Sequence, residues 1–161
     1  VAPFADAASA TILMSEEKAI QGGLTPKAVI CDIAVTSNDL YKFPLYGVVS
    51  SIKQLLFKNS LTFDDISLYE IHEATCPEHL LNLTTILGSQ YLISRSSNHF
   101  PQVNSWGGSF AFGHPFAATG VRLINMASNR LHKLDGARYA IVSSTAGGGL
   151  GYSILLEKYN R

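Results

Sequence analysis

The sequence predicts a single α/β domain in which helices cover a mostly parallel sheet. Apolar runs rich in Val, Ile and Leu alternate along the chain with segments of helical periodicity, which is the pattern of a layered α/β domain. Apolar residues make up 47% of the composition and charged residues 15%, a balance typical of a folded domain rather than a disordered segment. A chain of 161 residues is long enough to enclose one sizeable hydrophobic core.

The first half of the chain has the patterns of two strands and two helices. The apolar run at 10–14 predicts a short strand. Ser15 is a typical N-cap followed by acidic residues, so a helix is predicted from there to the glycine pair at 22–23. Residues 27–35, rich in Val and Ile, predict a buried strand. A helix is predicted over 46–59, where one side carries Val49, Ile52, Leu55 and Leu56.

The middle of the chain predicts a strand, a helix and two loops. Residues 66–71 predict a strand that ends at His72. A helix is predicted over 77–87, because Pro77 suits a first helical turn. The segments 88–103 and 104–116 are expected to be loops, the first because it is polar and contains Pro101 and the second because it is rich in glycine.

The last third of the chain predicts a long helix and two strands. The helix is predicted over 117–134, with Val121, Leu123, Ile124, Ala127 and Leu131 on its apolar side. Strands are predicted at 137–144 and 152–156, joined by a glycine loop, and the final strand is expected to run antiparallel to its predecessor. With 10–14, 27–35 and 66–71, the sheet has five predicted strands.

Charge and cysteine content exclude several classes of function. The 12 basic and 12 acidic residues cancel, so no basic excess indicates binding to nucleic acid. Two cysteines, Cys31 and Cys76, do not make a disulfide framework, which favours a reducing compartment. No apolar run reaches the length that spans a bilayer, and no metal site is predicted. Because the chain starts at Val1, we expect it to be processed, cleaved or incompletely traced.

Two histidine motifs lie where predicted elements end. The first is Glu70-Ile-His-Glu-Ala74, in which a neutral His72 at a strand end is able to donate a hydrogen bond to a developing oxyanion. The second runs from Gly107 to Pro115; its glycines allow close backbone approach, and the helix after it points its N-terminus towards His114. Taken singly, the first motif is more typical of a surface histidine at a strand end, and the second is equally typical of a functional site and of a tight turn with an incidental histidine.

A third motif, Ser143-Ser-Thr-Ala-Gly-Gly-Gly-Leu-Gly151, connects the last two predicted strands. Successive glycines expose backbone N–H groups that are able to form an oxyanion site. No lysine follows them, so the segment is not a phosphate-binding loop. A flexible hairpin is the alternative interpretation.

In this order, the three motifs resemble the C-terminal half of thiolases. The family pattern is Glu-x-(Asn/His)-Glu-Ala, then Gly-Gly-x-x-x-x-Gly-His-Pro, then Cys-x-Gly-Gly-Gly-x-Gly. His72, the segment 104–108 and the segment 113–116 are similar to the long-chain 3-ketoacyl-CoA thiolase branch, which includes the β subunit of the mitochondrial trifunctional protein. The start of the chain, from Asp6, also resembles the family, so nearly the whole sequence is covered.

The resemblance implies a fold, a domain division and a set of roles. It implies a layered α/β/α domain with a five-stranded mixed sheet, in which 1–15 is the tail end of the N-terminal domain and 16–161 the C-terminal domain. In the family, the residue at His114 activates a nucleophilic cysteine, that at His72 binds the thioester oxygen, that at Thr145 moves a proton at the α-carbon, and the backbone at Gly147 helps to hold an oxyanion. Gly113 and Phe116 are expected to contact coenzyme A, which with acyl-CoA is the expected substrate.

Two departures from the family pattern concern the chemistry. The nucleophilic cysteine belongs to the N-terminal half, and neither Cys31, in a strand, nor Cys76, at a helix start, is placed to replace it. Thr145 stands where the family has cysteine, and an alcohol is a far weaker acid than a thiol with its pKa near ~8.5. General acid–base assistance is worth roughly 10²–10⁴-fold, so we expect impaired catalysis. The segments 6–8 and 45–48, near the family's substrate and CoA site, also depart from its pattern.

Three hypotheses follow from the sequence. The chain is an active thiolase half completed by another chain that supplies the N-terminal half, a catalytically inactive pseudo-thiolase with a structural role in a larger assembly, or an unrelated α/β binding module. The motif series disfavours the last. By resemblance, we expect a thiolase-type dimer or larger complex located in mitochondria, either in the matrix or attached to an inner-membrane assembly.

Overall fold

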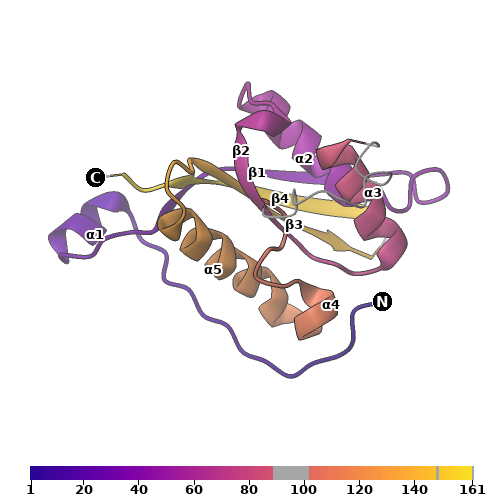
Figure 1. The fold of residues 1–161 in the computed structure, drawn as a ribbon, viewed down its shortest axis with the longest axis horizontal. Coiled ribbons are helices and arrows are strands. Elements are labelled where there is room, and N and C mark those ends of the chain that lie inside the picture. The colour runs from indigo at the N-terminus through magenta and orange to yellow at the C-terminus, as the bar shows by residue number, and fades with distance from the viewer. Residues whose placement is uncertain (89–101, 148, 161) are drawn as a thin grey trace.

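The structure, a computed structural model, describes residues 1–88, 102–147 and 149–160. Helices lie on both faces of one sheet, with α2 and α3 on one face and α5 on the other (Figure 1). This confirms the predicted α/β/α layering. The elements follow in the order α1 (Glu16–Gln21), β1 (Ala28–Ser37), α2 (Gly47–Lys58), the 3₁₀ helix η1 (Phe63–Asp65), β2 (Ile66–Ile71), α3 (Cys76–Leu87), α4 (Ser109–Phe112), α5 (Ala117–Lys133), β3 (Tyr139–Ala146) and β4 (Leu150–Lys158).

The sheet is mixed, with the strand order β1-β4-β3-β2. Strands β2 and β3 pair in parallel, whereas β4 pairs antiparallel with both β3 and β1. Three strands therefore run in one direction, and β4 is inserted between β1 and β3 in the other. The predicted antiparallel final strand is confirmed. The carboxyl ends of β2 and β3 lie side by side, because Ile71 pairs with Ser143.

The expected fifth strand at 10–14 is wrong: within the described residues the sheet has four strands, and this segment is a loop. Ile12 and Leu13 are 83% and 70% exposed. The apolar run predicted a strand, but a strand also needs a hydrogen-bonded neighbour, and none of the described strands pairs with it. Beside β2, Val103 makes an isolated parallel bridge to Tyr69. The preceding residues 89–101, predicted as a loop, lie outside the described residues.

The face of the sheet under α2 and α3 holds the larger hydrophobic core. The predicted apolar side of α2 is confirmed, since Val49, Ile52, Leu55 and Leu56 are all buried. Helix α3 begins where Pro77 predicts it, and Thr75 caps it by accepting a hydrogen bond from the Glu78 N–H at 3.4 Å. The core on this face consists of Ala34, Val48, Ile52, Leu55, Leu56, Ile66, Tyr69, Ile71, Leu83, Val103, Ile141 and Leu155.

The opposite face of the sheet is covered by α5. Leu123, Ala127 and Leu131 are buried against Leu68, Ala140, Val142 and Leu156. The buried Arg130 of α5 donates to the Glu70 carboxylate, so an ion pair lies beside this second core. Helix α4 was not predicted, because the glycines around it indicate a loop. It is a single turn, capped by Gly108 at its start and Gly113 at its end.

Strand β1 was predicted to be buried, but most of its side chains are exposed. It lies at the edge of the sheet and has only β4 as a neighbour among the described strands. Val29, Ile30, Ile33 and Val35 are each more than one-third exposed, and Ala34 alone of the strand is fully buried. Val and Ile content shows strand propensity but not strand position, so the sequence did not distinguish this edge strand from a central one.

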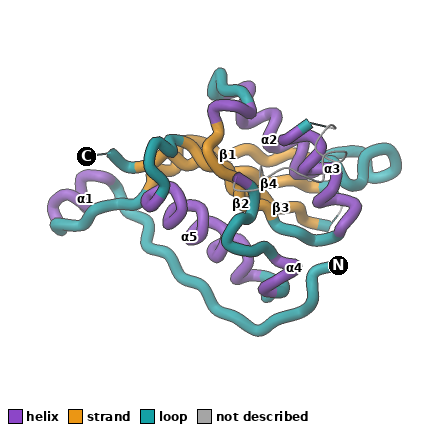
Figure 2. The backbone as a smooth tube through the Cα atoms, in the orientation of Figure 1, coloured by secondary structure: helices purple, strands orange, loops and turns teal. Residues whose placement is uncertain are grey.

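The N-terminal segment runs along the outside of the α5 layer before it reaches α1 (Figure 2). Asn125 of α5 holds it by donating to Ser9 Oγ at 3.2 Å and to the Ala10 carbonyl at 2.9 Å. At the start of the chain, the Ala2 N–H donates to the Ala74 carbonyl at 3.1 Å. Residues 2–10 therefore connect the end of β2 to the middle of α5. No helix in the described parts of the chain is long and apolar enough to cross a membrane.

Candidate active site

The two predicted histidines come together at the carboxyl end of β2. The His72 and His114 rings lie with their centroids 4.2 Å apart. His72 follows β2 directly, and its backbone N–H donates to the Ser143 carbonyl of β3 at 2.9 Å. His114 comes from the loop between α4 and α5, much later in the chain. The structure therefore places two motifs that are distant in sequence in one site.

A chain of hydrogen bonds favours one protonation form of His72. Arg122 Nη2 donates to Ser109 Oγ at 2.9 Å, and Ser109 Oγ lies 2.8 Å from His72 Nδ1. The guanidinium is only a donor, so the serine hydrogen is free to point at Nδ1. The His72 proton then belongs on Nε2, for which the described residues provide no hydrogen-bond partner. His72 is thereby prepared to donate a hydrogen bond from Nε2 to a substrate oxygen.

His114 is held by the N-terminal segment and by the first turn of α5. Its backbone N–H donates to the Pro3 carbonyl at 2.7 Å, and its ring nitrogen Nδ1 lies 2.8 Å from Thr119 Oγ1. The Phe116 ring packs on the imidazole with centroids 4.6 Å apart, and Phe4 stacks on Phe116 at 5.7 Å. The Phe116 ring thus covers one face of the His114 imidazole, and Thr119 fixes the orientation of the ring through Nδ1.

Both imidazoles are kept neutral at physiological pH. Burial, with contributions from His114 and Arg122, lowers the pKa of His72 to about 4. The pKa of His114 is also lowered, first by burial and then by the Arg122 charge. A neutral histidine offers one donor and one acceptor. The pair is therefore suited to donate from one ring to an oxyanion while the other ring accepts a proton from a nucleophile.

Glu73 supports the loop that carries Ser109. Its carboxylate accepts from Asn104 Nδ2 and from the Phe110 N–H, each at 2.8 Å. Asn104 also bonds to both backbone groups of Ile71, which ties the loop to the end of β2. A Cβ on Gly108 would overlap the Glu73 carboxylate. Gly108 is therefore needed for this support.

Gly113 and Phe116, the two residues expected to contact coenzyme A, have structural roles that the sequence did not predict. Gly113 has φ +83°, and a Cβ there would press on the Ala5 side chain at 2.6 Å. Phe116 has φ 47°, a conformation that is rare for an aromatic residue. Backbone strain of this kind collects at functional sites. Contact of either residue with coenzyme A stays a prediction.

Thr145 lies at the end of β3, but on the other face of the sheet from the histidine pair. Ser143 Oγ is hydrogen-bonded to Ser153 Oγ, which contacts Ser51 of α2. Since side chains alternate along a strand, Thr145 faces the same way as Ser143, towards α2 and α3. Its hydroxyl donates to the Leu150 carbonyl at 3.1 Å and interacts with the Glu78 carboxyl group of α3. No hydrogen bond of the described residues joins Thr145 to either histidine.

The glycine loop after Thr145 serves mainly as a packing surface in the described residues. The Gly149 carbonyl accepts from the Asn38 N–H at 3.0 Å and from its side-chain amide at 3.1 Å. A Cβ on Gly151 would overlap the Gly47 carbonyl, because the start of α2 rests on the backbone of β4. Gly147 is exposed and has open space around its Cβ position. Its expected contribution to an oxyanion site stays a prediction.

Neither cysteine joins the histidines. Cys31 lies on β1, where its Sγ contacts Glu157 at 3.8 Å, and burial and that carboxylate raise its pKa. Cys76 is the exposed first residue of α3. Both placements agree with the expectation that neither acts as the nucleophile.

Three functional-site residues were missed by reasoning from sequence: Arg122, Ser109 and Glu78. Arg122 carries no signal in the sequence beyond a polar position on an amphipathic helix, and Ser109 was part of the second motif without a role of its own. Glu78 does carry a signal, since Thr75-x-x-Glu78 is the pattern of a capping box. A buried position for that carboxylate follows only once α3 is placed over the end of β3.

Comparison with known proteins shows which family the chain resembles. Residues 24–158 match the family model described as "Thiolase, C-terminal domain". The trifunctional enzyme subunit beta, mitochondrial, of Bos taurus is 38% identical over 96% of this chain and 34% of its own length. A probable 3-ketoacyl-CoA thiolase of Caenorhabditis elegans is 38% identical over 97% of this chain and 36% of its own length.

A solved structure agrees with these relatives. Human mitochondrial 3-ketoacyl-CoA thiolase in complex with CoA superposes with a TM-score of 0.72 at 27% identity, covering 90% of this chain and 34% of the other. The chain thus spans about a third of the length of the curated relatives it matches. The family match extends from just before β1 to the end of β4 and includes both paired histidines, so this chain belongs to the thiolase family.

Proposed function

We propose that this chain supplies the histidine half of a 3-ketoacyl-CoA thiolase site, with slowed proton transfer because Thr145 replaces cysteine. The observation that carries this proposal is the contact between His72 and His114, whose ring centroids lie 4.2 Å apart. Thiolysis breaks a carbon–carbon bond next to a thioester and transfers the acyl group to free CoA. It requires a nucleophile, a base that activates it, and donors for the thioester oxygen.

The two histidines fit two of these roles. His72 presents a donor at Nε2, since Ser109 and Arg122 occupy its other side. His114 is the more exposed of the two and remains able to accept a proton from a nucleophile brought beside it. The positive charge of Arg122 lies near both rings and favours an oxyanion. The nucleophilic cysteine and its acyl group are expected from a segment or chain that supplies the N-terminal half.

The proposed substrate, partners and location of this chain are taken from the names of its relatives. Two matched structures contain coenzyme A, and relatives are named as mitochondrial subunits and 3-ketoacyl-CoA thiolases. We therefore extend the proposal to an acyl-CoA substrate that lies over Gly113 and Phe116, to a thiolase-type dimer or larger complex, and to mitochondria. Gly147 is assigned to the oxyanion site on the same grounds.

His114→Ala tests the proposal in the native protein or assembly that contains this chain. Thiolysis of a 3-ketoacyl-CoA, followed by loss of the substrate absorbance, is expected to fall by about 10²–10⁴-fold because a base is removed. His132→Ala is the matched control, since His132 is a histidine at the far end of α5. Equal rates for His114→Ala and the unaltered protein would refute the proposed role.

A second candidate function is a pseudo-thiolase subunit that no longer turns over. Thr145 favours it, because an alcohol does not ionise near neutral pH as a thiol does. In that case acyl-CoA binds, but no thiolysis is measured for the unaltered protein.

A further inference from the structure

The first residues of the chain are tied to both histidine motifs by backbone contacts. The Ala2 N–H donates at 3.1 Å to the carbonyl of Ala74, the last residue of the first motif. The His114 backbone N–H donates to the Pro3 carbonyl at 2.7 Å, and Phe4 makes an isolated parallel bridge with His114. The start of the chain is therefore fixed relative to both motifs, which places the Phe4 side chain beside the site.

Phe116, at the start of α5, has a strained backbone conformation. Its φ of 47° and ψ of −102° are close to those of the first central residue of a type II′ turn, a position that glycine usually occupies. A bulky side chain costs free energy in this conformation. Such strain persists only where surrounding contacts outweigh it, so the contacts of the Phe116 ring have to stabilise this conformation.

The Phe116 ring has two aromatic contacts. Its centroid lies 4.6 Å from that of the His114 imidazole and 5.7 Å from that of the Phe4 ring, which is stacked on it with an interplanar angle of 21°. Phe116 is 64% exposed and Phe4 is 84% exposed, so neither ring is enclosed by a hydrophobic core of this chain. Stacked rings attract each other beyond the area that they bury, and the stack therefore helps to hold Phe116 in place.

We propose that Phe4 is a positioning residue of the site, which holds the Phe116 ring against His114 and thereby sets the plane of the imidazole. This rests on the proposed function, in which His114 accepts a proton from the nucleophile. Thr119 holds the imidazole at one atom, Nδ1, and a single hydrogen bond leaves the ring free to tilt. The face contact with Phe116 removes that freedom, so that the other ring nitrogen is directed at the nucleophile.

Phe4→Ala and Phe4→Tyr test this role in the native protein that contains this chain. A stacked pair favours its arrangement by about two- to tenfold, so Phe4→Ala is expected to lower kcat for thiolysis of a 3-ketoacyl-CoA by up to about tenfold and to leave KM nearly unchanged. Phe4→Tyr keeps the stacked ring and is expected to retain the rate. Phe57→Ala is the matched control, because Phe57 of α2 is 87% exposed and has no aromatic partner among the described residues.

NMR signals of the His114 ring separate positioning from a general loss of stability. In Phe4→Ala, the Phe116 ring is expected to leave the imidazole, which changes the ring-current shift of the His114 signals. The pKa of His114 is expected to rise towards its ordinary value, because burial is the main cause of its lowering. The charge of Arg122 and the neighbouring His72 ring are unchanged in this variant. Phe4→Tyr and Phe57→Ala are expected to leave both quantities as they are in the unaltered protein.

Phe116→Gly, alone and together with Phe4→Ala, tests whether Phe4 acts through Phe116. Glycine adopts the backbone conformation of this position without strain but removes the ring, so Phe116→Gly is expected to lower kcat at least as much as Phe4→Ala. In the Phe116→Gly background, Phe4→Ala is expected to cause no further loss. Equal losses from Phe4→Ala in the two backgrounds, or His114 ring signals that stay unchanged in Phe4→Ala, would overturn the positioning role.

Two further outcomes distinguish the positioning role of Phe4 from the proposed function itself. Thiolysis that depends on His114 but is unaffected by Phe4→Ala, with unchanged His114 signals, would overturn the positioning role and leave the proposed function standing. A protein without thiolysis, in which Phe4→Ala but not Phe4→Tyr still shifts the His114 signals, would support the contact and overturn the proposed function alone.

Discussion

At the scale of single residues, the Ser109 hydroxyl is the partner of His72 Nδ1 and favours a proton on Nε2. Ser109→Ala removes the partner at Nδ1, so both tautomers of His72 become populated. We expect kcat/KM to fall on the order of tenfold, less than the roughly 10²–10³ that accompanies removal of an oxyanion donor. Nitrogen NMR shifts of His72 measure the tautomer directly, and Ser128→Ala, on the same long helix as Arg122, is the control. An unchanged tautomer in Ser109→Ala would show that Ser109 does not orient the ring.

Glu78 also makes stability depend on pH. Its pKa is raised from 4.5 to about 7 in the folded protein, so the folded state binds the extra proton between these values. The stability gained is present below pH 4.5 and is lost as the pH rises through 7. Glu78→Gln removes the charge, and the free energy of unfolding is therefore expected to exceed that of the unaltered protein on the order of 2–3 kcal/mol at about pH 8.

Denaturant unfolding at about pH 5 and about pH 8 measures this difference. The two proteins are expected to differ little at the lower pH, where Glu78 is mostly neutral in the folded state. His72 titrates with the opposite sign, since its pKa is lowered to about 4, but it is present in both proteins and cancels. A difference that is the same at both pH values would show that Glu78 is not a buried acid.

At the scale of elements, two glycines let α2 rest on β4. A Cβ on Gly151 would overlap the Gly47 carbonyl, which belongs to rigid backbone rather than to a flexible side chain. Gly151→Ala is therefore expected to lower the free energy of unfolding by about 3 kcal/mol or more. Gly120→Ala is the control: Gly120 lies in α5 with open space around it, and alanine there is expected to add about 0.5–1 kcal/mol. Similar stabilities for the two variants would contradict the close approach.

The sequence predicted elements that carry local signals, but not the position of strands, which depends on the segments beside them. Helices α2, α3 and α5 and strand β2 were confirmed, because caps, Pro77 and helical periodicity are local signals. Strand β1 was predicted as buried and is an edge strand, and 10–14 was predicted as a strand and is a loop. Both errors concern which segment lies beside which, a property that apolar content does not encode.

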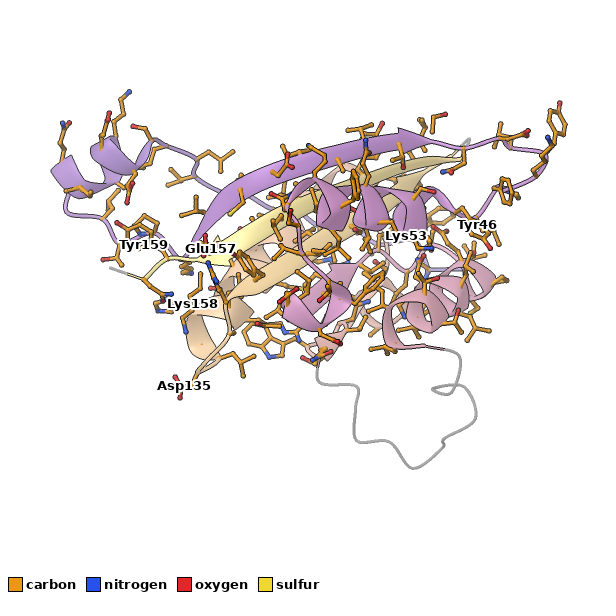
Figure 3. The ribbon with its side chains drawn as sticks, turned by 90° about the horizontal axis from the view of Figure 1, so that it is seen from above. Tyr46, Lys53, Asp135, Glu157, Lys158 and Tyr159 are labelled. Atoms are coloured by element: carbon orange, nitrogen blue, oxygen red, sulfur yellow. The ribbon has the colours of Figure 1, made fainter. Side chains whose placement is uncertain are left out.

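At the scale of the whole molecule, the resemblance assigned His72 and His114 to one site, and the structure places their rings in contact. Their catalytic roles stay predictions. The resemblance did not predict that Thr145 faces the opposite side of the sheet, which follows from strand alternation and the position of α3. Figure 3 shows the sheet from above, with Glu157, Lys158 and Tyr159 at one end and Tyr46 near the other, where β3 turns into β4.

Several large apolar side chains are exposed on the surface of the chain. Ile12, Leu13, Ile33 and Val35 are each more than half exposed. They lie on the N-terminal segment and on β1. Exposed apolar surface of this kind is typical of a face that another part of a protein covers, as expected if a thiolase N-terminal half packs there.

The histidine site is tested most sharply by the structure of the native protein containing this chain with an acyl-CoA bound. We expect a cysteine sulfur from outside these 161 residues within hydrogen-bond reach of His114, and the thioester oxygen hydrogen-bonded to His72 Nε2. An acyl-CoA bound elsewhere, or no cysteine beside His114, would contradict this expectation.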